Sequence, residues 1–247
     1  MWNRSAIKEK AKGRISVNYW KMVVAGLVAA FFTGSSPSFN INYNNNEFDS
    51  FGDAVAHNIP FVGDGFDFGM LMGLGAMLVG VAIVVAIAAI ALSVFVINPL
   101  LVGTKRFFYI NIFNVAELRE LGTGFETGYR NKVKTMFLKD LYTFLWSLLF
   151  IVPGIIKAYE YRMIPYILAE NPEISTEEAF RMSHDMMMGN KWDAFVFDLS
   201  YIGWFILSAI TFGIVGIFYV NPYYHQGCAM LYDAIKYDWN TKSEVEF

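Results

Sequence analysis

The longest apolar run of the chain covers residues 70–103 and contains no charged side chain. Its sequence is MLMGLGAMLVGVAIVVAIAAIALSVFVINPLLVG, in which Ser93 and Asn98 carry the only polar side chains. A helix needs about 20 apolar residues to cross a bilayer, and backbone polar groups in lipid must be satisfied within the segment itself. The run therefore predicts a membrane-spanning helix.

Three other apolar stretches are candidates for further spans. Residues 20–33 predict a first span, and residues 193–235 predict two spans near the end of the chain. Residues 140–169 are interrupted by Pro153-Gly154, a pair that marks either a tight turn or a sharp kink. A turn makes two short spans of this stretch, whereas a kink makes one long span.

The distribution of Lys and Arg sets the orientation of these segments. Neither residue type occurs from Met22 to Thr104, so the polar part of that interval, residues 34–69, is predicted to be an external loop. The same rule, together with the basic amphipathic pattern of the N-terminus, predicts three cytoplasmic segments: a helix on the membrane surface at 1–19, a connecting segment at 104–139 and a tail at 236–247. Residues 170–192 carry only Arg181 and Lys191, so the charge rule does not place them. This predicted helix is cytoplasmic if Pro153-Gly154 is a turn.

A weak internal repeat bears on the number of spans. The motif Asn-x-Trp precedes a span at residues 18–20 and again at 190–192, and Asn-Pro occurs near the end of the return span at Asn98-Pro99 and at Asn221-Pro222. One unit therefore recurs: a surface helix, Asn-x-Trp, a span, and a return span with Asn-Pro. Repeats of this kind are frequent in membrane proteins.

The repeat favours an even number of spans between its two copies, because Trp20 and Trp192 then both lie at the inner interface, where Trp is favoured. Pro153-Gly154 is then a turn. We predict an all-α polytopic transmembrane helical bundle, one integral membrane domain over residues 1–247 with six spans and both termini in the cytoplasm. Four spans is the alternative, and a pair of re-entrant half-helices around Pro153 is a third arrangement.

Composition agrees with the membrane class. The chain is 55% hydrophobic and only 17% charged, against roughly 25% charged residues in soluble domains. Its net charge of −3 gives no strong attraction to nucleic acid. The single cysteine, Cys228, excludes an intrachain disulfide.

Three stretches of the chain carry a resemblance to a known family. They read IVPGIIKAYEYRMIPYILAENPEIS, EEAFRMSHDMMMGNKW and NPYYHQGCAMLYDAI. They resemble a family of bacterial multi-spanning integral membrane proteins catalogued only as a domain of unknown function, and more distantly the membrane domain found beside some glycerophosphodiester phosphodiesterases. The resemblance implies a location in the bacterial plasma membrane, and it supplies no activity.

Lys157, Glu160 and Arg162 form the strongest candidate site. Lys157 and Glu160 are three residues apart, so on a helix they share one face and can pair, whereas Arg162 points elsewhere. An unpaired ionisable group inside a span costs several kcal/mol. Two interpretations stay open: a polar cluster that lines a path for substrate or protons, and a pair that closes the hairpin while Lys157 reaches the outer interface.

Asp198 and His225 are further polar candidates in the last two spans. Asp198 fits either a proton acceptor or helix cap, or a shallow residue hydrated from the cytoplasm. His225 lies in a polar patch with Tyr223, Tyr224 and Gln226. Structural packing is the favoured interpretation of this histidine, because a metal site needs three or four ligands.

Asn98 and Asn221 precede the two prolines of the repeat. Proline removes an N–H group and frees a carbonyl one turn back in a helix, and an asparagine amide is suited to satisfy such groups. The paired breaks fit either a central binding site, as in transporters with broken helices, or two helix ends near the lipid headgroups.

The sequence contains no catalytic or metal-ligand motif, so we predict that the protein is not an enzyme and carries no cofactor or metal. The leading hypothesis is a membrane protein that binds or moves a small or amphiphilic ligand. The alternative is a structural or accessory subunit that docks a partner protein through its cytoplasmic amphipathic helices. The expected partners are the lipid bilayer and either another protein or a second copy of the chain.

Overall fold

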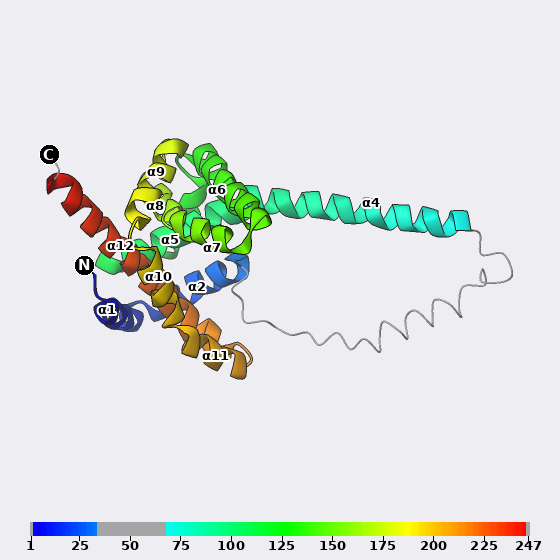
Figure 1. The fold of residues 1–247 in the computed structure, drawn as a ribbon. Helices are drawn as coiled ribbons and strands as arrows, with labels where there is room; N and C mark the ends of the chain where they lie inside the picture. Colours follow the sequence, from blue (N-terminus) through cyan, green and yellow to red (C-terminus); the bar gives the residue numbers. More distant parts are fainter. Residues whose placement is uncertain (1, 34–67, 246–247) are drawn as a thin grey trace. The chain divides into compact units, whose positions relative to one another are not determined.

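The computed structural model describes residues 2–33 and 68–245, and these residues form helices and connecting turns without any strand (Figure 1). The predicted all-α class is therefore confirmed. Nearly all of the predicted external loop, residues 34–67, lies outside the described residues. The chain divides into two compact units. Of the described helices, α4 (Phe68–Leu92) belongs to one unit and all others to the other unit.

Two helical segments are long and apolar enough to cross a membrane. They are Gly75–Phe113, which includes most of α4, and Lys191–Ile210. A third apolar helix, Tyr19–Ala29, is shorter. α4 has no polar face, as its sequence FGMLMGLGAMLVGVAIVVAIAAIAL makes plain. The six-span arrangement is more detailed than this finding of two candidate spans, and it stays a prediction.

The larger unit contains helices from both ends of the chain. Its order is α1 (Arg4–Val17), α2 (Tyr19–Thr33), η1 (Ser93–Ile97), α5 (Asn98–Phe113), η2 (Leu118–Phe125), α6 (Tyr129–Leu149), α7 (Ile151–Glu160), α8 (Ile164–Glu170), α9 (Thr176–Met187), α10 (Lys191–Leu199), α11 (Ile202–Ile210), η3 (Gly216–Val220) and α12 (Asn221–Val245). η1 and η3 are π-helices, and η2 is a 3₁₀ helix.

The core of this unit lies around α5 and α12. Phe107 and Phe108 on α5 and Leu231 on α12 are fully buried. Tyr109 and Tyr232 meet edge to face, with their ring centroids 5.5 Å apart. Apolar burial of this kind stabilises each large side chain by roughly 1.5–3 kcal/mol, so these contacts help to hold α5 against α12.

The two copies of the predicted repeat share their local structure. A five-residue π-helix ends directly before Asn-Pro in each copy, η1 before Asn98 and η3 before Asn221. Both asparagines are 3% exposed. The tyrosines of the central pair, Tyr109 and Tyr232, each lie ten residues after the proline of their own copy. Equivalent positions of the repeat therefore meet in the core.

The amphipathic helices α1 and α9 also correspond. Each has three buried residues at intervals of four, which places them on one face, and each such set ends three residues before the asparagine of Asn-x-Trp. These residues are Ile7, Ala11 and Ile15 on α1, and Ala179, Ser183 and Met187 on α9, where Met186 is buried as well. We predicted that helix 1–19 lies on the membrane surface, but its apolar face is buried inside the unit, where α1 packs against α12.

The chain reverses between α6 and α7 at Phe150, whose backbone is extended (φ −155°, ψ 143°). We predicted the turn at Pro153-Gly154, but both residues lie in the first turn of α7, where a proline needs no N–H partner. Gly154 permits the close approach of the two helices, because a Cβ at this position would lie 2.6 Å from Cα of Ser147.

The return arm of this hairpin also differs from the prediction of a short span reaching residue 169. α7 ends at Glu160, and α8 is a separate helix. Ile164, Ile167 and Leu168 on α8 are fully buried. The apolar sequence IPYILA of α8 therefore covers a core rather than continuing the arm.

η2 packs against α5 through two close backbone contacts. A Cβ at Gly124 would overlap the carbonyl of Pro99, and a Cβ at Gly103 would overlap the carbonyl of Leu121. Lys132 on α6 is buried, and its Nζ donates to the carbonyl of Thr123 at 2.6 Å. Burial lowers the pKa of Lys132. These contacts hold residues 118–125 against α5.

Gly124→Ala should destabilise the unit, because the added methyl group forces η2 away from α5. Overpacking of this kind costs about 1–3 kcal/mol. Gly122→Ala is the matched control, since it lies in the same 3₁₀ helix and no described atom comes within 4 Å of a Cβ there. Thermal unfolding in detergent, followed by tryptophan fluorescence, measures both variants. Equal unfolding temperatures would contradict the packing described for η2.

Candidate functional site

A corner between α7 and α8 positions two of the predicted site residues. α7 ends at Glu160, and Pro165 stands in the first turn of α8, where its fixed φ suits a helix start. The intervening residues 161–163 form a turn. The corner turns the side chains of Glu160 and Arg162 toward different groups of helices.

Glu160 is the centre of a cluster of basic groups. Its Oε1 lies 2.6 Å from Nζ of Lys157 and 3.1 Å from Nδ1 of His184, and its Oε2 lies 2.5 Å from Nζ of Lys191. The predicted pair of Lys157 with Glu160 is therefore confirmed. The residues that complete the cluster, His184 on α9 and Lys191 on α10, are ones that sequence reasoning missed.

The Glu160 cluster joins three helices. Glu160 is 4% exposed, and its backbone carbonyl accepts a hydrogen bond from Ser183 Oγ at 2.6 Å. Both carboxylate oxygens already have basic partners, so this carboxylate offers no oxygen free of such a partner. The contacts fit the role of connecting α7 to α9 and α10.

Arg162 and Asp198 form a second charged group. Arg162 donates from Nη1 to Oδ2 of Asp198 at 2.6 Å and from Nη2 to Oδ1 at 2.8 Å. Tyr159 donates to Oδ2 at 2.8 Å, and Tyr224 donates to Oδ1 at 3.1 Å. Two-point contacts of arginine with carboxylate are the strong form of an ion pair. Asp198 is thus the fixed partner of an arginine, which none of our interpretations of Asp198 included.

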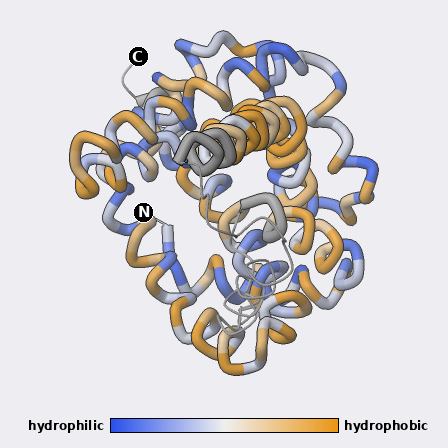
Figure 2. Tube along the Cα trace, turned by 90° about the vertical axis from the view of Figure 1, so that its right-hand side faces the viewer, coloured by the Kyte–Doolittle hydropathy of each residue, from blue (hydrophilic) through white to orange (hydrophobic). Residues whose placement is uncertain are grey.

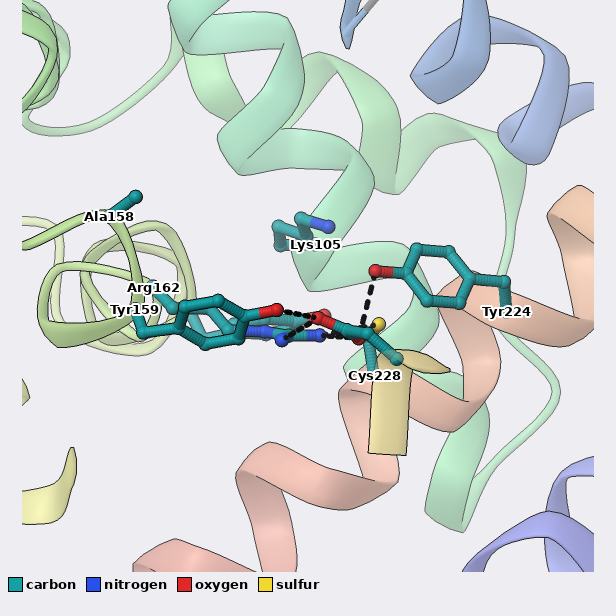
Figure 3. Close-up of a pocket in the computed structure, with 8 residues that line it drawn as sticks. Lys105, Ala158, Tyr159, Arg162, Tyr224 and Cys228 are labelled. Carbon is teal, nitrogen blue, oxygen red and sulfur yellow. Dashed lines mark hydrogen bonds and ion pairs between the residues drawn. The ribbon is translucent and has the colours of Figure 1, made fainter. Parts of the chain in front are cut away.

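The Arg162–Asp198 pair lines a cavity of about 210 Å³ (Figure 3). The other lining residues come from four helices: Lys105 on α5, Ala158 and Tyr159 on α7, Tyr166 on α8, and Tyr224 and Cys228 on α12. Ala158 is exposed, so the cavity reaches the surface beside α7. Cys228 Sγ accepts from Nη2 of Arg162 at 3.3 Å.

Lys105 is the charged residue of this cavity that sequence reasoning missed. It projects from α5 into the space bordered by Tyr159 and Tyr224, and no dashed line joins it in Figure 3. Its Nζ lies 5.3 Å from the ring centroid of Tyr166. The only sequence signal was that Lys105 is the first charged residue after the long apolar run, and we used that position for orientation alone.

Asn98 and Asn221 do not meet in a central site. Asn98 Nδ2 donates to Oδ2 of Asp140 at 2.8 Å. The amide nitrogen of Asn221 is buried without a hydrogen-bond partner among the described residues. Neither residue lines the cavity. Both lie at the change from π-helix to α-helix, so the predicted helix breaks are present as changes of helix type.

His225 is buried beside the cavity residue Tyr224 without lining the cavity itself. Its ring stacks on Phe108 at 5.6 Å between centroids. Neither ring nitrogen has a hydrogen-bond partner within the part of the chain that the structure describes. In that same part, no group of three His, Cys, Asp or Glu residues is arranged to hold a metal ion.

Comparison with known proteins identifies the family of the chain. A model of the family described as "Protein of unknown function (DUF975)" matches residues 68–238, well over half of the sequence. The prediction of a family known only as a domain of unknown function is therefore confirmed. No curated protein and no solved structure matches the chain. The more distant similarity to the membrane domain of phosphodiesterases stays a prediction.

Glu160→Gln should destabilise the protein, because it leaves Lys157 and Lys191 beside a neutral side chain. Removing one partner of a buried ion pair costs about 3–5 kcal/mol. Glu178→Gln is the matched control, since Glu178 is exposed and its ion pair with Arg181 is long, at 3.9 Å. Such exposed pairs contribute about 0–1 kcal/mol. Unfolding temperatures in detergent test the pair of variants, and an unchanged value for Glu160→Gln would show that the cluster contributes nothing to stability.

Proposed function

The chain belongs to the DUF975 family, and we propose that it is an integral membrane protein of the bacterial plasma membrane that binds or moves a small or amphiphilic ligand. The ligand site in this proposal is the cavity lined by Lys105, Arg162 and Asp198. The observation that carries the proposal is this cavity, which places charged and hydroxyl groups close to exposed apolar side chains of α7. Ligand sites in proteins combine apolar surface with a few placed polar groups in this way.

Exposed apolar side chains at two chain reversals support a membrane location. From Leu148 to Val152, between α6 and α7, five consecutive residues are 64–77% exposed. After α11, Phe212 is 86% exposed. The hydrophobic segment at the bottom of Figure 2 lies at the same height as α11 in Figure 1. Soluble proteins rarely expose contiguous apolar patches, whereas lipid covers such surfaces at no cost.

The length of the α6–α7 hairpin favours a re-entrant arrangement for residues 140–169. The apolar part of α6, residues 141–149, rises only about 14 Å at 1.5 Å per residue, against a hydrocarbon core of about 30 Å. We therefore propose four full crossings, with the α6–α7 hairpin entering and leaving the membrane on the cytoplasmic side. Both termini then remain cytoplasmic, and residues 34–69 remain external.

The alternative function, docking of a partner protein through the amphipathic helices, has less support. The faces of α1 and α9 that would receive a partner are buried within the unit, where Ala11 and Ala179 are fully covered. Trp20 and Trp192, which follow these helices, are 69% and 71% exposed. Exposed Trp at helix starts is also the pattern of a membrane interface.

Cysteine labelling tests the proposed topology. In a Cys228→Ser background, Glu177→Cys should react with a membrane-impermeant maleimide only in permeabilised cells, and Phe212→Cys should react in intact cells. Phe150→Cys should react in neither, because the tip of a re-entrant hairpin lies in the hydrocarbon. Labelling of all three after solubilisation in detergent is the control. Labelling of Phe150→Cys from outside would favour six spans over four. Labelling of Glu177→Cys from outside would contradict the cytoplasmic placement of α9.

Native mass spectrometry tests ligand binding. The purified protein should retain a defined added mass, and Ala158→Trp should lose it because the indole fills the cavity opening. Ile156→Trp is the matched control, since Ile156 is exposed on the same helix and does not line the cavity. An absence of added mass, together with no saturable stabilisation by a panel of metabolites and lipids, would contradict the proposed function.

A further inference from the structure

We propose that the ligand of this cavity is an anion, held through its carboxylate or phosphate group by the ammonium group of Lys105. This inference rests on the proposed ligand-binding function and names the chemical class of the ligand. The cavity is lined by two cations, Lys105 and Arg162, and by one carboxylate, Asp198. Its formal charge is therefore +1 when the site is empty.

Asp198 does not neutralise Lys105, because its hydrogen-bonding capacity is used elsewhere. Its two oxygens accept four hydrogen bonds, two from Arg162 and one each from Tyr159 and Tyr224. Two carboxylate oxygens offer about four acceptor sites. Arg162 and Asp198 therefore form a closed, neutral pair, and they act as a rigid wall of the cavity.

Lys105 forms no ion pair with any carboxylate of the residues that the structure describes. Its Nζ faces the ring of Tyr166 at 5.3 Å, a distance at which a cation is attracted to an aromatic ring. That contact uses no hydrogen bond, so the three donors of the ammonium group have no partner among the described residues. A half-buried lysine without an anion is unfavourable, and a bound anion removes this penalty.

Tyr166 supplies a second, independent indication. It lines the cavity, is 2% exposed, and its hydroxyl has no hydrogen-bond partner within the described part of the chain. The ring itself is fixed, because it stacks on Tyr232 at 4.8 Å between centroids. Buried hydroxyl groups are almost always hydrogen-bonded. Lys105 and Tyr166 thus both line the cavity and carry donors without a partner among the described residues, and an acidic group with several acceptor oxygens can satisfy both.

The size of the cavity limits the bound group. Its volume of about 210 Å³ is below the roughly 300–1,000 Å³ of sites for drug-sized ligands. It admits a carboxylate, a phosphate or a phosphate headgroup, and not a complete lipid. Ile155, about half exposed on α7 one turn before the opening at Ala158, offers apolar surface to a chain attached to that group. The acidic group therefore comes either from a free anion or from an acidic amphiphile.

Binding of defined anions to the purified, full-length protein tests the inference. Inorganic phosphate and acetate are titrated in detergent, and thermal stabilisation is measured at constant ionic strength. In a second arm, the protein in nanodiscs of phosphatidylcholine receives increasing fractions of phosphatidic acid. We expect saturable stabilisation in at least one arm. Stabilisation by the free anions identifies a free anion as the ligand, and stabilisation by the acidic lipid alone identifies an acidic amphiphile.

Substitutions assign the effect to Lys105. Lys105→Met should weaken the binding of the anion that stabilises the wild-type protein at least tenfold, since it removes a charge-assisted contact. Lys105→Arg should retain binding, and Tyr166→Phe should weaken it a few-fold. Lys134→Met is the control, because Lys134 is exposed on α6 and does not line the cavity. Unchanged binding in Lys105→Met overturns the inference.

The outcomes also separate the inference from the function on which it rests. Saturable binding of a neutral or cationic compound, blocked by Ala158→Trp while neither anion arm responds, overturns the anionic assignment and leaves ligand binding in place. No saturable binding of any compound, with no added mass in native mass spectrometry, overturns both.

Discussion

Large apolar side chains at the two chain reversals have no covering partner among the described residues, and this constraint governs the rest of the account. Leu148 to Val152 and Phe212 would be unfavourable in water, where apolar surface costs roughly 25 cal/mol per Å². In the membrane location that we propose, lipid removes this cost. Charged side chains close to such surface must then be paired, because unpaired charges in lipid are expensive.

Two carboxylates of the larger unit, Glu160 and Asp198, are paired in this way. Glu160 is bound by basic groups from α7, α9 and α10, and Asp198 by Arg162 and two tyrosine hydroxyls. Buried ion pairs add little net stability, but the loss of one partner is costly. We therefore interpret both carboxylates as positioning groups. Lys105 has no such partner among the described residues, and in our proposal a ligand supplies the charge that pairs with it.

The repeat gives this arrangement a simple origin. Lys105 and Cys228 both line the cavity, and each lies six residues after the proline of its own Asn-Pro motif. The cavity thus draws one residue from the same position of each copy, on α5 and on α12. The first copy carries a cation at this position, Lys105, and the second carries a small neutral side chain, Cys228. The two copies of the repeat therefore contribute different chemical groups to the cavity.

Local patterns predicted the elements that depend on neighbouring residues. The charge-free run indicated α4, and the spacing of Lys157 and Glu160 predicted their pair. The two Asn-Pro motifs predicted discontinuities in the helices, and the structure has a change from π-helix to α-helix at each. Contacts between distant segments had no such signal. Asp198 follows its partner Arg162 by 36 residues, and Lys105 and Tyr166 are brought together by packing alone.

Hydropathy also could not separate two kinds of apolar segment. The sequence IPYILA reads as the continuation of a span, yet Ile164, Ile167 and Leu168 are buried in a protein core. The residues around Phe150 have similar hydropathy and are exposed. Both environments favour the same side chains, so only the surrounding helices decide between protein and lipid as the covering surface.

The depth of the α6–α7 hairpin in a bilayer tests the central claim most directly. A nitroxide label is placed at Val152, and separately at Glu177, in Cys228→Ser protein reconstituted into liposomes. Its collision rates with oxygen and with a water-soluble nickel complex are then compared. If lipid surrounds the hairpin, oxygen dominates at Val152 and the nickel complex dominates at Glu177. Equal access of the nickel complex to both positions would place the hairpin in water and contradict the account.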